Sequence, residues 1–319
     1  MPVRPSRVPA RSKLPAPGLP PVADAPARLR VGVIGAGRVG SVLGAALAAA
    51  GHDVEAAAGV SRESAERAAR LLPGVPLLPA DEVVAASDLV VLAVPDDVLA
   101  GLVAGLAETG SWRRGQLLFH TSGAHGLAVL EPAERAGVLT LALHPAMTFT
   151  GAPEDSDRLV SAPFGVTSRV EHRAVAEMLV LEMGGEPFWI DEADRRLYHA
   201  ALVTGANHLV TLVAEAADLL RAAGVEAPDR VLAPLLTAAL DNGLRRGDRG
   251  LTGPVSRGDV GTVRDHLQTL AERAPASVEA YAALARRTTE RALAAGRLRP
   301  AEGAPLLELL GTSAEEAAR

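Results

Sequence analysis

The chain has 319 residues, 48% of them hydrophobic, which is enough for two domains with sizeable cores. Its formal net charge of −6 gives no reason to expect nucleic acid as a partner. The absence of cysteine excludes disulfides, thiolate nucleophiles and cysteine-ligated zinc. Lys13 is the only lysine, so no domain that begins after it can use a lysine as a proton donor.

Residues 1–29 are rich in proline and arginine and contain one acidic residue, Asp24. They lack the apolar segment of a signal peptide, and we expect a disordered basic arm. No run of 18 or more apolar residues is free of charged or strongly polar side chains, so we expect no membrane-spanning helix. A cytoplasmic protein is the simplest expectation.

From about residue 30 to residue 190, short apolar runs alternate with alanine-rich stretches typical of helices. The predicted helices include GSVLGAALAAAG, SRESAERAARLL and PDDVLAGLVAGLAE. Continuous apolar strands separated by helices are typical of a parallel sheet covered on both faces. The pattern predicts an α/β fold with a doubly wound parallel sheet of the Rossmann type. The predicted strands are RVGVIG, DVEAAAGV, DLVVLAV, GQLLFHTS, VLTLALH, FGVTS and PFWI.

After Asp191 the strand pattern stops, and the remaining sequence predicts an all-α domain. The predicted domains are therefore the arm at 1–29, the Rossmann domain at 30–191 and the helical domain at 192–319. The helices are expected at about 192–223, 227–246, 259–273, 276–296 and 304–311.

The motif GAGRVG is the strongest local signal, because it follows a predicted strand and opens a predicted helix. Gly35 permits the tight turn, Gly37 lets a pyrophosphate approach the backbone, and Gly40 lets the helix pack on the strand. The helix N-terminus then faces the phosphates. The alternative is a glycine-rich turn without a ligand. The residues predicted to contact a dinucleotide here are Gly35, Ala36, Gly37, Arg38, Val39 and Gly40.

The end of the second strand indicates which dinucleotide is preferred. A site for NAD(H) usually has an acidic residue there, whereas this chain has Ser61 and Arg62. A hydroxyl and a guanidinium suit a 2′-phosphate, so the sequence favours NADP(H) over NAD(H). The alternative is that Arg62 is a solvated residue at a helix start.

Three further strand ends belong to the same carboxyl edge of the predicted sheet. The AVP run is expected beside the cofactor, the TSG run to admit a ring or substrate, and the histidine of HPAMTF to face the substrate. Each could instead only end a strand. These residues are Ala93, Val94, Pro95, Thr121, Ser122, Gly123 and His144.

Six segments together resemble the Rossmann-like and DUF2520 domain proteins over about 30–290. These belong to the wider group of 6-phosphogluconate dehydrogenase-like and pyrroline-5-carboxylate reductase-like NADP oxidoreductases. The resemblance implies an NADP-binding domain followed by a helical domain that commonly pairs with a second subunit, and it implies no substrate. The segments are GAGRVG, AVPDD, HTSG, HPAMTF, RRLYHAALVTGANHLV and LTGPVSRGDVGTVRDHL.

Many relatives in the wider group place a lysine near an asparagine on the first long helix of the second domain. This chain has His199 and Asn207 there and no lysine. Imidazole can donate a proton near neutral pH, so His199 is the predicted proton donor, with Asn207 bonding the substrate. The alternative is that His199 is a core histidine bonded to a backbone carbonyl.

The segment LTGPVSRGDVGTVRDHL is predicted to be a turn before a helix. Thr252, Ser256 and Arg257 could reach the substrate, with Arg257 pairing a carboxylate, or they could serve as caps or interface residues. Thr252 or Asp259 could cap a helix. The histidine spacing gives no metal motif, and no metal is expected.

The sequence therefore predicts an NADP(H)-dependent oxidoreductase that acts on a small carbonyl or imine compound. A 2-oxo acid such as ketopantoate is the first substrate to test, on the resemblance alone. The alternative is a non-catalytic NADP(H)-binding sensor or regulatory protein. A homodimer formed through the helical domain is expected.

Overall fold

The computed structural model describes residues 28–311, and the backbone of this part divides into two units. One unit ends at Leu202 and the other begins at Val203. The predicted arm lies almost entirely outside the described residues. The division comes later than the expected boundary at 191/192, because the buried Arg195 anchors the first turns of the long helix to the sheet.

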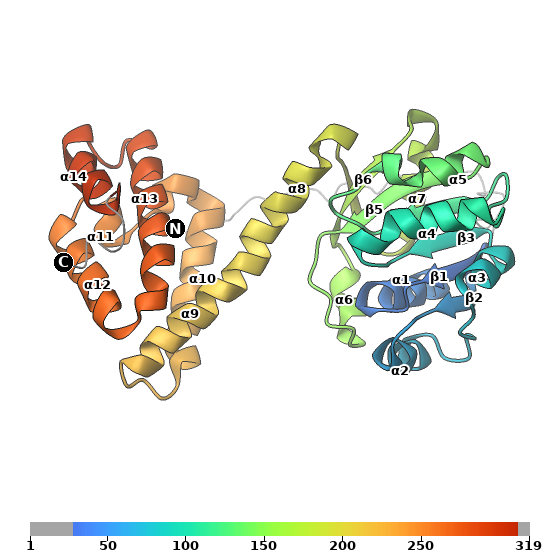
Figure 1. The fold of residues 1–319 in the computed structure, drawn as a ribbon, viewed down its shortest axis with the longest axis horizontal. Helices are drawn as coiled ribbons and strands as arrows, with labels where there is room; N and C mark the ends of the chain where they lie inside the picture. Colours follow the sequence, from blue (N-terminus) through green and yellow to red (C-terminus); the bar gives the residue numbers. More distant parts are fainter. Residues whose placement is uncertain (1–27, 312–319) are drawn as a thin grey trace, which may run out of the picture. The chain divides into compact units, whose positions relative to one another are not determined.

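The first unit is built on a seven-stranded sheet in the order β2-β1-β3-β4-β5-β6-β7 (Figure 1). All seven predicted strands are present, which confirms the Rossmann-type fold. The strands are β1 (Arg30–Ile34), β2 (Asp53–Ala58), β3 (Leu89–Leu92), β4 (Leu117–His120), β5 (Leu139–Pro145), β6 (Pro163–Ser168) and β7 (Glu186–Trp189).

The sheet departs from the predicted parallel arrangement at one place, where β6 runs antiparallel to β5. The connection between them folds into a loop and the short helix α6 (Glu154–Leu159), which packs beside α1 (Arg38–Ala49). A parallel connection usually needs a helix that crosses the sheet. The antiparallel pairing sets His144 of β5 opposite Gly165 of β6.

Side chains alternate between the two faces of the sheet, as the two-residue period of a strand requires. Leu89 and Val91 of β3 join the core under α1 and α7, while Val90 and Leu92 join the core under α3 and α4. The remaining helices of this unit are α2 (Arg62–Leu71), α3 (Ala80–Ala86), α4 (Asp96–Glu108), α5 (Glu131–Arg135), α7 (Arg173–Glu182) and α8 (Arg195–Leu202). The sequence patterns predicted α1, α2 and α4 but not α3, α5, α6 or α7.

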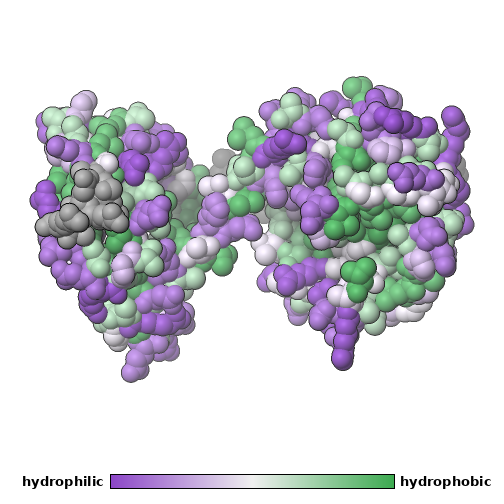
Figure 2. All heavy atoms as spheres, viewed as in Figure 1, coloured by the Kyte–Doolittle hydropathy of each residue, from purple (hydrophilic) through white to green (hydrophobic). Residues whose placement is uncertain are grey.

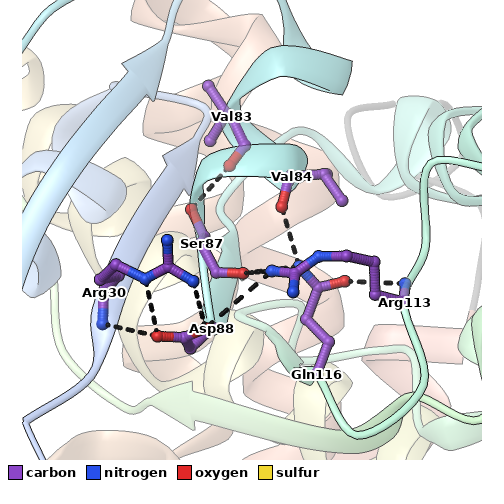
Figure 3. Close-up of polar contacts among 7 residues, drawn as sticks. All are labelled: Arg30, Val83, Val84, Ser87, Asp88, Arg113 and Gln116. Carbon is purple, nitrogen blue, oxygen red and sulfur yellow. Dashed lines mark hydrogen bonds and ion pairs between the residues drawn. The ribbon is translucent and has the colours of Figure 1, made fainter.

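A polar network closes the amino-terminal edge of the sheet (Figure 3). The guanidinium of Arg30 donates to both carboxylate oxygens of Asp88, at 3.0 and 2.8 Å. The buried Gln116 amide donates to the carbonyl oxygens of Val84 and Ser87, at 2.9 and 2.8 Å. These bonds join the starts of β1, β3 and β4 to the end of α3 and leave the opposite edge for the site.

The second unit is entirely helical, as predicted. Its core lies among α11, α12, α13 and α14. Its elements are a π-helical turn (Val203–Asn207), α9 (His208–Ala222), α10 (Pro228–Arg246), α11 (Gly253–Ser256), α12 (Val260–Arg273), α13 (Val278–Ala294) and α14 (Pro300–Gly311).

The helices α9 and α10 are apolar yet scarcely buried. No residue of α9 is buried, and only Pro228 and Leu232 of α10 are. Apolar side chains at the surface of this unit appear green in Figure 2. The continuous helix Glu192–Ala222 is also long and apolar enough to cross a membrane, with a mean hydropathy of 1.3 and none of its apolar window buried. No membrane-spanning helix was expected, because every run of 18 or more apolar residues contains charged or strongly polar side chains.

Candidate active site at the carboxyl edge of the sheet

The turn after β1 has the close packing that its glycines predict. Gly35 has φ +97°, and a Cβ atom there would lie 2.4 Å from the Ala93 carbonyl oxygen. A Cβ atom at Gly40 would lie 2.1 Å from the Gly35 carbonyl oxygen. At Gly37, by contrast, the nearest atom would be 3.9 Å away. The fold therefore requires Gly35 and Gly40, whereas Gly37 leaves space that a ligand can use.

A cavity of about 690 Å³ opens at this turn, between the ends of β1, β2 and β3. The start of α1 faces it without a side-chain cap and without an acidic residue in the first turn, so its amide groups suit an anion. Arg38 and Val39 begin that helix. The lining includes the predicted residues Gly35, Ala36, Gly37, Ser61, Ala93, Val94 and Pro95, together with Gly59, Val60, Leu77, Pro79 and Val98.

Ser61 and Arg62 lie at the start of α2. The Ser61 hydroxyl accepts a hydrogen bond from the Ser64 amide at 3.1 Å and so caps the helix. Arg62 is exposed and forms an ion pair with Glu66 at 2.8 Å. Ser61 lines the cavity, whereas Arg62 does not, and the role of both residues in selecting NADP(H) stays a prediction.

Three more arginines gather around Gly151, in the loop that follows β5. Arg70 donates to the Gly151 carbonyl oxygen at 2.9 Å, and a Cβ atom at Gly151 would touch Arg67 and Arg38. The buried carboxylate of Asp155 holds the loop, because it accepts hydrogen bonds from the Gly151 and Thr150 amides at 2.7 Å each. Burial alone would raise the pKa of Asp155, but these amide donors lower it below its ordinary value.

The turn after β4 is held by His120. The Ser122 amide donates to Nδ1 of His120, so Nε2 carries the proton and donates to the Gly126 carbonyl oxygen at 2.9 Å. Burial lowers the pKa of His120 to about 3, so it is neutral in the folded protein. The Ser122 hydroxyl accepts from the Ala124 and His125 amides. Ser122 therefore shapes the turn through its side chain, and Thr121 continues the strand by donating its amide to the Leu92 carbonyl oxygen.

Gly123, at the tip of this turn, lies between two histidines. A Cβ atom at Gly123 would lie 2.7 Å from Cδ2 of His199 and 3.0 Å from Nε2 of His144. The two imidazole rings pack edge to face with their centroids 6.0 Å apart. The structure thus brings together three residues that the sequence placed on a strand end, on a turn and on a helix.

Tyr198 joins this cluster. Its phenol oxygen lies 2.7 Å from Nδ1 of His144, and its ring packs edge to face on Phe188. A Cβ atom at Gly165 would lie 2.8 Å from the phenol oxygen, so only a glycine at this position of β6 leaves room for it. Burial lowers the pKa of His144 to about 4, with the charge of Arg195 acting in the same direction, and burial raises the pKa of Tyr198 to about 12. Both side chains are neutral at pH 7.

Arg195 is the charged residue of the cluster, and it is fully buried. Its guanidinium donates to the Ser122 carbonyl oxygen at 2.8 Å and to the Thr167 hydroxyl at 2.9 Å. Within residues 28–311, its Nε has no hydrogen-bond partner. Arg195 therefore fixes α8 against β6 and the turn after β4, and its positive charge acts on His144.

The sequence patterns did not assign roles to His120, Arg195 or Tyr198. Tyr198 and Arg195 lie on an amphipathic helix whose register against the sheet no sequence spacing specifies. A sequence signal existed only for His120, the histidine of HTSG. A histidine at the end of a buried strand needs hydrogen-bond partners for both ring nitrogens.

The remaining predicted residues belong to the helical unit. Asn207 is exposed at the end of the π-helical turn, and its pairing with His199 stays a prediction. Ser256 is buried and donates its hydroxyl to the Gly253 carbonyl oxygen at 3.1 Å, which is a local bond within its own helix. Thr252 and Arg257 are exposed, and Asp259 caps α12 through the Thr262 amide. Residues 28–311 contain no group of three or more His, Asp or Glu side chains that could hold a metal ion.

Comparison with known proteins agrees with this architecture. Residues 20–145 match the profile of a Rossmann-like domain, and residues 162–288 match DUF2520, a domain of unknown function. The chain carries a Rossmann-like domain followed by a DUF2520 domain. No curated protein sequence matches it.

Several solved structures share the fold. A candidate NADP oxidoreductase from Bacteroides fragilis is 25% identical, with a TM-score of 0.69 over 82% of this chain and 98% of that one. An imine reductase from Pseudomonas sp. is 19% identical, with a TM-score of 0.54 over 91% and 95% of the two chains. An imine reductase from Myxococcus stipitatus, solved in complex with NADP⁺, is 20% identical, with a TM-score of 0.53 over 90% and 94%.

Proposed function

We propose that this Rossmann-like and DUF2520 domain protein is an NADP(H)-dependent oxidoreductase that acts on a small carbonyl or imine compound. One observation carries the proposal: the cavity at the glycine turn and the His144, Tyr198 and His199 cluster occupy the carboxyl edge of one sheet. Ligands of open α/β sheets bind at this edge. The fold shared with the Bacteroides fragilis protein and with imine reductases supports the same assignment.

The residues of the glycine turn fit a dinucleotide. The uncapped start of α1 would bind the pyrophosphate, and the open position at Gly37 would let it approach the backbone. NADPH, when bound, supplies a hydride. His199 borders the same turn as His144 and is the proposed proton donor, in a protein that has no lysine among residues 28–311 to take that role.

The direct test combines cofactor binding with turnover. Purified protein is expected to quench NADPH fluorescence and to oxidise NADPH when a panel of small ketones, 2-oxo acids (ketopantoate among them) and cyclic imines is added. His199→Ala should abolish the oxidation and keep the binding, while the exposed His208→Ala serves as the control. NADPH binding without oxidation of any kind would support the sensor alternative, and absence of NADPH binding would refute both.

We also propose that two copies associate through α9 and α10. The exposed apolar side chains of these helices include Val210 at 70%, Leu235 at 62% and Leu244 at 80% exposure. An apolar surface of this kind is unfavourable in water and is typical of an interface. A second copy is the occupant that the resemblance to DUF2520 proteins implies.

A further inference from the structure

The hydrogen bond between Tyr198 and His144 fixes which nitrogen of His144 carries the proton. Among the described residues, the phenol oxygen has no hydrogen bond other than the one to Nδ1 of His144. If Nδ1 carried the proton, the phenol hydrogen would lack an acceptor at a half-buried position. A phenol that donates to Nδ1 satisfies both groups, and the imidazole proton then resides on Nε2.

The Nε2 atom of His144 points to the tip of the turn after β4. It lies next to Gly123, on the side where Cδ2 of His199 also approaches. No protein acceptor bonds to this nitrogen among residues 28–311. A neutral imidazole with a free N–H group at a sheet edge is therefore available as a hydrogen-bond donor to a ligand.

The charges around this donor favour an electron-rich ligand atom. Arg195 is buried beneath it, and no carboxylate of residues 28–202 hydrogen-bonds to Arg195, His144 or Tyr198. The carboxylates that act electrostatically on Arg195 are Glu192 and Asp96, and Glu192 already accepts from the Leu127 and Ala128 amides. An iminium ion would bring a second positive charge and an N–H donor against donors, whereas a carbonyl oxygen brings an acceptor.

We propose that His144 donates a hydrogen bond to the substrate oxygen, that Tyr198 is the residue that positions His144, and that the substrate is a carbonyl compound rather than an iminium ion. The inference rests on the proposed function and narrows it. In the reduction, the carbonyl carbon accepts the hydride and the C=O π pair moves to the oxygen. His144 keeps its proton and stabilises the resulting alkoxide, which takes a proton from His199.

The tautomer of His144 gives a test that does not need turnover. In protein with ¹⁵N-labelled histidine at pH 7, His144 is expected as the Nε2–H tautomer. Tyr198→Phe should abolish that preference, while Phe188→Leu, which removes only a ring contact, should keep it. An Nδ1–H tautomer in the native protein, or an unchanged tautomer in Tyr198→Phe, would overturn the inference.

Kinetics test the donor role and the substrate class. His144→Phe should lower kcat on the carbonyl substrate about 100-fold or more, as loss of an alkoxide-stabilising donor does, with NADPH affinity unchanged. Tyr198→Phe should lower kcat about 10- to 100-fold. His144→Gln keeps an N–H donor, so its kcat should lie between that of His144→Phe and that of the native protein. NADPH oxidation with cyclic imines but not with carbonyls of similar size would overturn the inference and leave the proposed function standing. Failure to oxidise NADPH with either class would instead refute the proposed enzyme.

Discussion

The phenol oxygen of Tyr198 lies 2.7 Å from Nδ1 of His144, although the two residues are 54 positions apart in the chain. One is on the first helix beyond the sheet and the other is at the end of β5. Arg195, one turn before Tyr198, donates to the turn after β4 and to Thr167 of β6 and so fixes this register. The first turns of α8 therefore bring the polar cluster together at the edge of the sheet.

Gly37 is proposed to leave space for the ligand, whereas Gly40 is required by the packing of the fold. Gly37→Ala should leave the unfolding free energy nearly unchanged, because a methyl group there meets no atom closer than 3.9 Å. It should weaken NADPH binding about tenfold or more by obstructing the pyrophosphate. Gly40→Ala is the contrast, since its Cβ would lie 2.1 Å from the Gly35 carbonyl oxygen and should destabilise the protein. Equal NADPH affinity in Gly37→Ala and the native protein, measured by calorimetry, would contradict the proposed pyrophosphate position.

Arg62 should determine the preference for NADPH. Arg62→Ala should weaken NADPH binding about tenfold, the loss of a charge-assisted hydrogen bond, and leave NADH binding unchanged. Glu66→Ala is the matched control, because it removes the partner of Arg62 and keeps the guanidinium. If the ratio of the two dissociation constants stays the same in Arg62→Ala, Arg62 is only a solvated helix-start residue.

The buried histidines predict how stability depends on pH. The pKa of His144 falls to about 4 and that of His120 to about 3, from an ordinary value of 6.5. The unfolded chain therefore binds more protons between about pH 4 and 6.5, and the unfolding free energy should rise with pH across this range and then level off. Urea unfolding of the native protein and of His144→Gln should show a smaller slope in the variant. Identical slopes would mean that His144 titrates normally.

Asp155 should stabilise the loop that faces the arginines. Asp155→Asn weakens the bonds from the Thr150 and Gly151 amides, so the unfolding free energy at pH 7 should fall by about 1–3 kcal/mol. Because the folded-state pKa is lowered, this contribution is present above about pH 4 and is lost as the pH falls through the folded value. Asp157→Asn, at an exposed position of the same helix, should have no such effect. A difference between native protein and Asp155→Asn that persists at low pH would argue against the carboxylate as its source.

The apolar helices predict the oligomeric state. The protein should elute as a dimer in size-exclusion chromatography with light scattering, and Leu235→Asp or Leu244→Asp should yield monomers. Val170→Asp, at an exposed apolar position of the sheet unit, should remain dimeric. A monomeric native protein that binds lipid vesicles would instead indicate that these helices meet a membrane.

The sequence predicted the sheet well, because apolar runs and glycine turns are local signals. The strand before GAGRVG and the glycine turn itself both follow from residues only a few positions apart, whereas the cap at Ser61 was not predicted. The antiparallel direction of β6 was not predictable, because it depends on where the loop between β5 and β6 packs. Helix α7, which buries Ala176, Leu179 and Val180 against the sheet, was not among the predicted helices.

The sequence predicted which strand ends contribute residues to the site, but not how their side chains lie relative to one another. His144, Gly123 and His199 were all identified, yet their meeting depends on how α8 lies against the sheet. That arrangement is set by the buried bonds of Arg195, which no spacing in the sequence reveals. Tyr198 acquired its role only from its contact with His144.

A crystal structure of the complex with NADP⁺ tests the central claim most directly. The account predicts that the pyrophosphate lies on the amides at the start of α1 and that the nicotinamide lies beside Gly123, in van der Waals contact (about 4 Å) with the turn between His144 and His199. A nicotinamide ring placed away from these two histidines, or no bound cofactor at millimolar NADP⁺, would contradict it.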